Sequence, residues 1–189
     1  MVLVEGVSDQ LAVEALARRR GLDLAADGVA VLPMGGATNI GHFLERYGPP
    51  GLDLPVAGLY DEAEARFFRR GLERVGIGDD LSIAEMESAG FFVCVADLED
   101  ELIRALGIAA VEQIIDAQGD LSSLRILQQQ PDQREKSDQA RLRRFMGTRG
   151  GRKIAYAPVL VDALDLDRVP APLDGLLEHL GRAESGILR

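Results

Sequence analysis

The sequence is poor in the residues that carry much of the redox, zinc and nucleophilic chemistry of proteins. Of its 189 residues, one is cysteine, two are histidine and none is tryptophan. The single cysteine, Cys94, excludes an internal disulfide framework and a zinc cluster built on cysteines, and its place in an apolar run predicts a small buried side chain. His42 and His179 lie on helical patterns, far from any serine or cysteine nucleophile elbow. With 5% aromatic residues, the chain offers little platform for stacking nucleic-acid bases.

Long apolar segments are absent as well. No stretch reaches the roughly 18 apolar residues that a membrane span requires, and residues 1–6 lack the basic start and long apolar region of a signal peptide. Together with the scarcity of cysteine, these absences predict a cytoplasmic protein that does not engage membranes.

Basic residues are fewer than acidic ones: the chain has 21 basic and 31 acidic side chains and a net charge of −10. This balance argues against a protein that coats nucleic acid or membranes through bulk charge, although it does not exclude an acidic site that recruits cations. The content of 47% hydrophobic and 28% charged residues is typical of globular proteins. The length suits one domain, or one domain with a modest insertion.

Short apolar runs alternate with helical patterns in the first half of the chain, which predicts βαβ units and a parallel sheet with covered faces. The predicted strands are 2–4, 29–32, 55–60 and 91–96, and the predicted helices are 8–20, 38–47, 62–75 and one beginning at residue 99. Between about 107 and 146 no strand pattern appears, and we interpret this polar, helical segment as an insertion. A fifth strand is predicted at 154–160 and a last helix at 173–180.

Acidic residues gather where three of these strands end. Glu5 directly follows the first strand and Asp61 the third. The other acids near the three ends are Asp9, Glu62, Glu64, Asp97, Glu99 and Asp100. Because the carboxyl ends of parallel strands share one edge of the sheet, we expect the carboxylates to converge there, where they repel unless cations or protons intervene. Oxygen ligands without nearby Cys or His suit Mg²⁺ or Mn²⁺ rather than zinc.

Some of these acids also have a purely structural interpretation. Asp9, Glu62, Glu64 and Asp100 sit where a helix cap or a first-turn acid is favourable. Glu5 and Asp61 are harder to explain in this way, since each directly follows an apolar strand.

Basic residues concentrate before the predicted fifth strand. Residues 134–153 contain eight Lys or Arg and two acids, a local balance of +6 that leaves −16 for the rest of the chain. A cationic strip beside metal-holding acids is what a phosphodiester substrate requires. Two interpretations of Arg141, Arg143 and Arg144 remain open. They form a solvated helix face, or, together with the run into 150–153, they contact a nucleic-acid backbone; the sequence favours both about equally.

Several of these segments match known motifs. The segments 2–9 (VLVEGVSD), 32–36 (LPMGG) and 59–61 (LYD) resemble the Toprim domain of topoisomerases, bacterial primases and certain nucleases. More narrowly, 96–102 (ADLEDEL) and 147–153 (GTRGGRK) are similar to the C-terminal nuclease region of the OLD (overcoming lysogenisation defect) family. The resemblance covers nearly the whole chain, and the ordered set of motifs is specific.

The resemblance implies an α/β fold: a Toprim-like Rossmannoid parallel sheet flanked by helices, with an inserted helical subdomain. Residues 1–106 would be the Toprim core, 107–146 the helical insertion and 147–189 the C-terminal part returning to the sheet. The implied activity is that of a metal-dependent DNA endonuclease that hydrolyses phosphodiesters with two Mg²⁺ or Mn²⁺ ions. In the family an N-terminal ABC-type ATPase domain precedes this region. No ATPase signature is present here, and we interpret the chain as the nuclease region without its ATPase.

The resemblance also assigns residues to roles. The implied metal ligands are Glu5, Asp9, Asp61, Glu64, Asp97 and Glu99. The Asp-x-Asp of Toprim domains is replaced by Asp61-Glu62-Ala63-Glu64, so the second acidic role passes to Glu64, with Glu62 as the alternative. Glu5 would be a ligand or the general base, and Lys153 would steady the scissile phosphate. The implied substrate contacts are Gly35, Gly36, Arg149 and Arg152.

Other functions fit parts of the pattern. A phospho-signalling receiver also places acids after strands one and three and a lysine after strand five, but it has no place for a long insertion before Lys153. A noncatalytic metal- or partner-binding Toprim module is the main alternative, and the altered acidic pair favours it mildly. Topoisomerase or primase activity is less favoured, because no transesterifying tyrosine or zinc module accompanies the domain; Tyr47, Tyr60 and Tyr156 look structural.

Overall fold

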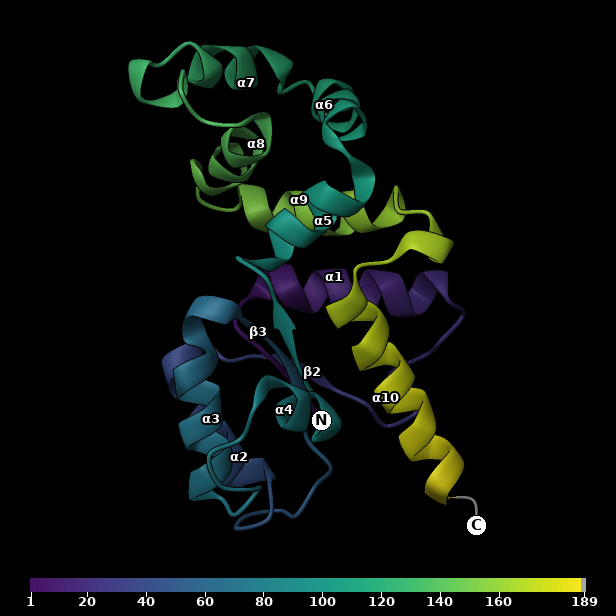
Figure 1. Ribbon diagram of the computed structural model, residues 1–189. Coiled ribbons are helices and arrows are strands. Elements are labelled where there is room, and N and C mark those ends of the chain that lie inside the picture. Colours follow the sequence, from purple (N-terminus) through teal and green to yellow (C-terminus); the bar gives the residue numbers. More distant parts are fainter. Residues whose placement is uncertain (188–189) are drawn as a thin grey trace.

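Four short parallel strands form the centre of this computed structural model, which describes the backbone of residues 1–187 and the side chains of residues 1–182 (Figure 1). The strand order is β2-β1-β3-β4, and every pairing is parallel. The strands are β1 (Val2–Val4), β2 (Val31–Pro33), β3 (Ala57–Asp61) and β4 (Phe91–Cys94). The predicted α/β fold with a parallel sheet flanked by helices is therefore confirmed, and each of the first four predicted strands is present within a few residues of its predicted bounds.

The sheet is buried on both faces because its strands alternate between two hydrophobic clusters. Val4, Leu59 and Cys94 point to one cluster, which also contains apolar residues of the helices α1, α5, α9 and α10. Leu3 and Tyr60 point to the other, which is filled from α2, α3 and α4. Short, continuously apolar strands are what two-sided burial requires. Cys94 is a buried free thiol, as its sequence context predicts.

Helices account for most of the remaining chain. The α-helices are α1 (Val7–Arg19), α2 (Ile40–Tyr47), α3 (Ala65–Arg74), α4 (Ile83–Ser88), α5 (Leu98–Leu106), α6 (Ile108–Ala117), α7 (Leu121–Gln128), α8 (Asp138–Gly147), α9 (Arg152–Asp162) and α10 (Ala171–Ile187). The short 3₁₀ turns are η1 (Ala37–Asn39), η2 (Glu62–Glu64), η3 (Pro131–Gln133) and η4 (Leu166–Arg168). Sequence reasoning missed α4, although Ser82 caps it and Glu85 closes a capping box at its start.

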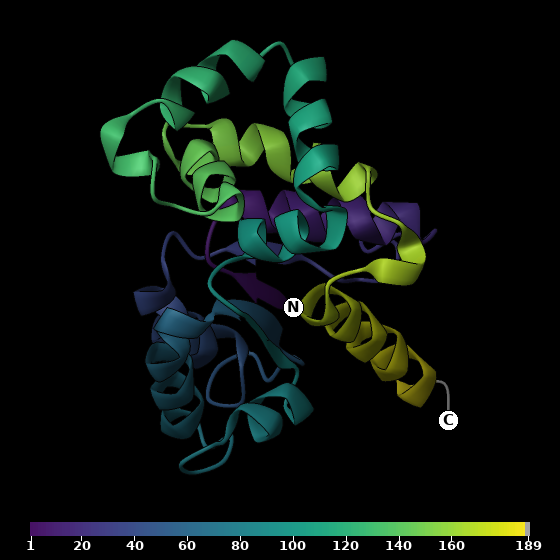
Figure 2. The ribbon, with the colours of Figure 1, turned by 45° about the horizontal axis from the view of Figure 1, so that its top comes forward.

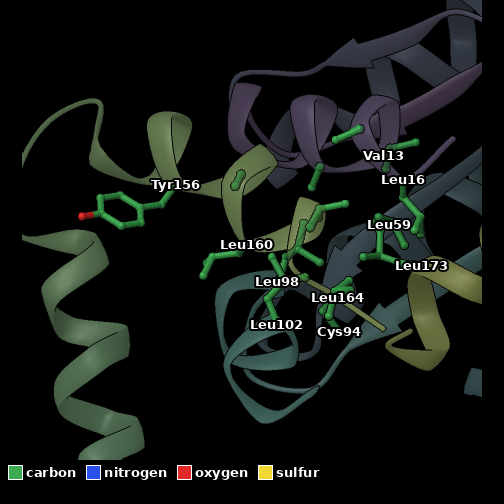
Figure 3. Packing of buried hydrophobic residues seen from close by; sticks show 14 of the residues in the cluster. Val13, Leu16, Leu59, Cys94, Leu98, Leu102, Tyr156, Leu160, Leu164 and Leu173 are labelled. Atoms are coloured by element: carbon green, nitrogen blue, oxygen red, sulfur yellow. The ribbon is translucent and has the colours of Figure 1, made fainter. Parts of the chain in front are cut away.

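The strand predicted at 154–160 is wrong, because this segment lies inside α9. Its apolar residues follow a helical spacing: Tyr156, Ala157 and Leu160 are buried, whereas Ile154 is exposed. The helix packs along α1 and against α5, so that it is covered on two sides (Figure 3). A short apolar run surrounded by neighbours on two sides cannot be distinguished from a buried strand by its periodicity. Helix α10 packs on β3 and β4.

Helices α6, α7 and α8 form a separate layer beyond α5 and α9, away from the sheet (Figures 1 and 2). This layer corresponds to the segment that the sequence marks as an insertion. Helix α8 packs on α5, and through it the layer reaches the end of β4. Among the described residues, no helix has both the length and the apolar character to cross a membrane.

The connections place a switch point between the two central strands. From β1 the chain passes through α1 to β2, on one side, whereas from β3 it passes through α3 and α4 to β4, on the other. In open parallel sheets, ligands bind in the crevice beyond the carboxyl ends of the strands at such a point. Glu5 and Asp61 stand at these two strand ends.

Candidate metal centre

Three carboxylates line the switch point. Glu5 follows β1, Asp9 lies in the first turn of α1, and Asp61 is the last residue of β3. Asp9 is fixed by its own helix, because its Oδ2 accepts a hydrogen bond of 2.8 Å from the Gly6 N–H. Glu5 Oε2 is buried and has no hydrogen-bond partner among the described residues. A buried carboxylate oxygen without a donor is costly, and this one points to a missing cation or proton.

Mutual repulsion and loss of water make these three groups reluctant to ionise. Burial is the largest cause of the raised pKa of Asp61, about 8, and the charges of Glu5 and Asp9 add to it. Burial likewise raises the pKa of Asp9 to about 7, against the opposing hydrogen bond from Gly6. The pKa of Glu5 is raised, first by burial and then by the charge of Glu64, although Lys153 lowers it. A pKa near neutrality is typical of carboxylates gathered at functional sites.

Two further carboxylates come from the end of β4, and both already have cationic partners. Asp97 and Glu99 are 7% and 5% exposed. Asp97 caps α5, its Oδ1 accepting the Asp100 N–H at 2.9 Å, while its Oδ2 accepts Arg143 Nε at 2.7 Å. Glu99 Oε2 accepts Lys153 Nζ at 2.8 Å, and the same Nζ lies 3.9 Å from Asp97 Oδ2. These short charge-assisted contacts neutralise most of the charge on this pair.

The side chains at this edge are suited to bind a divalent cation. They are carboxylates, and their oxygens are the ligands that hard ions such as Mg²⁺ and Mn²⁺ prefer. The unpartnered Glu5 oxygen and the raised pKa of Asp61 both indicate that positive charge is needed at this edge. No three carboxylate, imidazole or thiol side chains of the described residues stand close enough to surround an ion without some rearrangement.

The two acids after Asp61 behave differently. Glu64 is partly buried, and its charge is the largest electrostatic contribution to the raised pKa of Glu5. Glu62 is exposed. The geometry therefore brings Glu64, the preferred of the two in the sequence, closer to the cluster.

The predicted substrate contacts separate into two groups. Gly35 and Gly36 form a tight turn with φ of +71° and +123°, which favours glycine, and the Gly36 N–H donates to the Glu5 carbonyl at 3.1 Å. Arg149 is exposed and, together with Lys153 and the start of α1, lines a groove of about 360 Å³.

Arg152 does not join them. It is 7% exposed, donates to Thr148 Oγ1 at 2.7 Å and stacks on the Phe145 ring at 3.9 Å. Its guanidinium is held inside the fold by these contacts, and its role as a substrate contact stays a prediction.

A larger hollow, of about 840 Å³, lies away from these acids, between α1 and the segment that leads into β2. Its lining is largely apolar, and it brings together none of the carboxylates described above.

Sequence reasoning missed the role of α8. Arg143 and Gln139 are one helical turn apart, and both reach acids at the start of α5: Gln139 Nε2 donates to Asp100 Oδ1 at 2.8 Å. The spacing of four residues was visible in the sequence, but its target was not. A second missed feature is Ala96, whose φ of +70° is unusual for a residue with a side chain and lies directly before Asp97.

Comparison with known proteins agrees with this geometry. Residues 1–62 match the family described as "Overcoming lysogenization defect protein-like, TOPRIM domain". The C-terminal region of the Xanthomonas campestris pv. campestris OLD protein is 28% identical, with a TM-score of 0.78 over 100% of this chain and 97% of that one. The C-terminal region of the Burkholderia pseudomallei OLD protein has a similar fold, with a TM-score of 0.74 at 23% identity over 97% of each chain. No curated protein sequence matches the chain.

Proposed function

We propose that this chain, which resembles the Toprim-bearing C-terminal region of OLD proteins along its whole length, is a divalent-metal-dependent DNA endonuclease. The observation that carries the proposal is the convergence of Glu5, Asp9 and Asp61 around an unpartnered buried oxygen, with a lysine beside them. Toprim domains generally bind divalent metals. Hydrolysis of a phosphodiester requires such charge, because negative charge builds up on the phosphate in the transition state.

The proposal assigns two sets of ligands. Glu5, Asp9, Asp61 and Glu64 would hold one divalent ion, Mg²⁺ or Mn²⁺, and Asp97 and Glu99 would complete the site of a second. When bound, such ions supply Lewis-acid stabilisation of phosphate oxygens and lower the pKa of water. The protein's contribution is to hold these carboxylates together at one sheet edge, where a divalent cation relieves their mutual repulsion.

Lys153 would bind the scissile phosphate. Its Nζ is held 2.8 Å from Glu99 and its side chain is 41% exposed, so the ammonium can face an incoming anion while it stays anchored. Glu5, whose buried Oε2 has no hydrogen-bond partner among the described residues, would act either as a ligand or as the acceptor of a proton from water. Arg149, which lines a groove with Lys153, and the Gly35–Gly36 turn, whose Gly36 N–H donates to the Glu5 carbonyl, would contact the DNA backbone.

The test is cleavage of supercoiled plasmid in the presence of Mg²⁺ or Mn²⁺. Glu5→Ala and Asp61→Ala abolish cleavage under this proposal, and chelation by EDTA does the same. Asp116→Ala, which removes an exposed acid of α6 far from the sheet edge, is the matched control and retains wild-type activity. Full activity in both site variants would contradict the proposal.

The alternative is a noncatalytic metal- or partner-binding Toprim module. The observation in its favour is Ala63 in place of the second acid of Asp-x-Asp. Binding of Mn²⁺ without turnover of any DNA substrate, with or without the ABC-type ATPase domain that precedes this region in the OLD family, would select it.

A further inference from the structure

One arginine of the helical insertion holds the carboxylate at the end of β4. Arg143 Nε donates to Asp97 Oδ2 at 2.7 Å, and the arginine side chain is 43% exposed whereas that of Asp97 is 10% exposed. The second oxygen of Asp97 accepts the Asp100 N–H. Both oxygens of Asp97 therefore have partners within the chain.

The carboxylates on the other side of the crevice lack such partners. Within the part of the chain that the structure describes, Glu5, Asp9 and Asp61 form no ion pair with a lysine or arginine. Their oxygens meet one backbone N–H, that of Gly6 on Asp9, and one oxygen of Glu5 meets no donor at all. The site thus has an uncompensated half, Glu5, Asp9 and Asp61, and a compensated half, Asp97 and Glu99.

The position of Arg143 is fixed by its helix. Gln139, one turn earlier in α8, donates to Asp100 Oδ1 at 2.8 Å, so two side chains of α8 hold the first turn of α5. Beneath them Leu142 and Phe145 are buried in the core. The packing of α8 therefore fixes where the Arg143 guanidinium meets Asp97. Moving the guanidinium away breaks one of the two side-chain hydrogen bonds that α8 makes to the start of α5.

We propose that Arg143 is a built-in counter-ion of Asp97, which a divalent cation must displace, so that the compensated half binds metal more weakly than the uncompensated half. The inference rests on the proposed function, in which both halves hold metal. A cation that approaches Asp97 is repelled by the guanidinium and competes with it for the same oxygen. At the uncompensated half a cation instead meets carboxylates with no rival, and it relieves their repulsion.

The consequence is an order of loading. The first ion binds at Glu5, Asp9 and Asp61, and the second binds only as Arg143 leaves Asp97. The displaced guanidinium is then exposed on α8 beside the site, where a phosphate of the substrate can accept it. Metal loading at Asp97 is in this way coupled to the helical insertion.

The experiment is a Mn²⁺ titration of the complete chain, followed by calorimetry and by the spin-resonance signal of free Mn²⁺. Wild type should show two classes of site whose dissociation constants differ at least about tenfold, the ratio that corresponds to ~1.4 kcal/mol. Arg143→Gln removes the charge and should tighten the weaker class by roughly tenfold. Asp61→Asn should remove the tighter class and so identify it.

Two controls isolate the charge of Arg143. Arg144→Gln removes the neighbouring exposed arginine, which makes no ion pair among the described residues, and should leave both classes within about twofold of wild type. Arg143→Lys keeps the positive charge and should keep the weaker class weak. It also separates loss of charge from any loss of structure, which circular dichroism of each variant checks directly.

The outcomes distinguish the inference from the function. Two equal classes that Arg143→Gln does not change would overturn the inference and leave the proposed function standing. Weaker binding in Arg143→Gln would also overturn it, because it would show that Arg143 orients Asp97 for the metal. A wild-type chain that binds no Mn²⁺ would overturn the proposed function itself.

Discussion

The two halves of the candidate site are built from the same residue types but are stabilised in opposite ways. Glu5, Asp9 and Asp61 form no ion pair among the described residues, and burial first, then the charges of neighbouring carboxylates, raise their pKa values. Asp97 and Glu99 are at least as buried, yet each is paired with a basic side chain from a distant part of the chain. The difference teaches that burial alone does not make a carboxylate reactive. A buried carboxylate is left without compensation only where the fold places no basic side chain beside it.

Among the predictions that compare the two halves, the largest effect is expected from removing Lys153, which pairs with Glu99 and lies 3.9 Å from Asp97. Lys153→Met should lower the rate of DNA cleavage by about 10²–10³-fold, because one preorganised charge on the transition state is lost. It should also destabilise the fold, since Glu99 is left buried and unpaired. Lys136→Met is the matched control: this other lysine of the chain is exposed and remote, and its loss should change neither property. Equal loss of activity in both variants would contradict the assignment.

Neutralising one acid in each half should have opposite effects on stability. Without metal at pH 8, Asp61→Asn should raise the melting temperature, because it removes a repelled buried charge. Glu99→Gln should lower it, because it breaks a pair of 2.8 Å. Each shift should reach at least about 2–4 °C, which corresponds to roughly 1 kcal/mol in a domain of this size. Calorimetry of the two variants measures both, and shifts of the same sign would remove the distinction between the halves.

Stability should also depend on pH through the uncompensated half. The pKa of Asp61 is raised to about 8 and that of Asp9 to about 7, above the value of about 3.9 expected in the unfolded chain. Between about pH 4 and pH 8 the folded chain therefore holds protons that the unfolded chain has released, and the free energy of unfolding should fall as the pH rises through this window.

Saturating Mg²⁺ should flatten this dependence and release protons on binding at pH 7, which calorimetry in buffers of different ionisation enthalpy detects. Asp61→Asn should flatten the pH dependence of the free energy of unfolding even without metal. A metal-free wild type whose stability rises steadily from pH 5 to pH 8 would contradict the pKa assignment.

The smallest effect concerns the choice between Glu64 and Glu62. Glu64→Gln should weaken Mn²⁺ binding by about tenfold, because one of the four proposed carboxylate ligands of the first ion loses its charge. Glu62→Gln should change it little, because the Glu62 side chain is exposed. The same titration measures both variants, and a larger loss in Glu62→Gln would reverse the assignment.

Most of the sheet and its acidic edge could be predicted from the sequence. Val2–Val4 is apolar on both faces and is followed at once by Glu5, so strand and strand end are visible together. The parallel arrangement then brings Asp61 to the same edge by topology alone. These inferences need only local patterns and one general rule.

The segment at 154–160 failed because its environment is not local. Its apolar run includes the exposed Ile154, and the helical spacing of its buried residues is set by the packing of α1 and α5 rather than by the run itself. The inward orientation of Arg152 was likewise not visible in the sequence, because its partners Phe145 and Thr148 are brought to it by the fold. The pairing of Arg143 with Asp97 joins residues 46 positions apart, and no periodicity in the sequence could reveal it.

The most direct measurement of the central claim is a crystal structure of the chain grown with Mn²⁺, with data collected at the manganese absorption edge. The account predicts two anomalous peaks at the carboxyl edge of the sheet. One would be bounded by Glu5, Asp9 and Asp61 and the other by Asp97 and Glu99, the second appearing only at higher Mn²⁺ concentration. Strong manganese peaks elsewhere, with the Glu5 and Asp61 carboxylates unliganded, would contradict it.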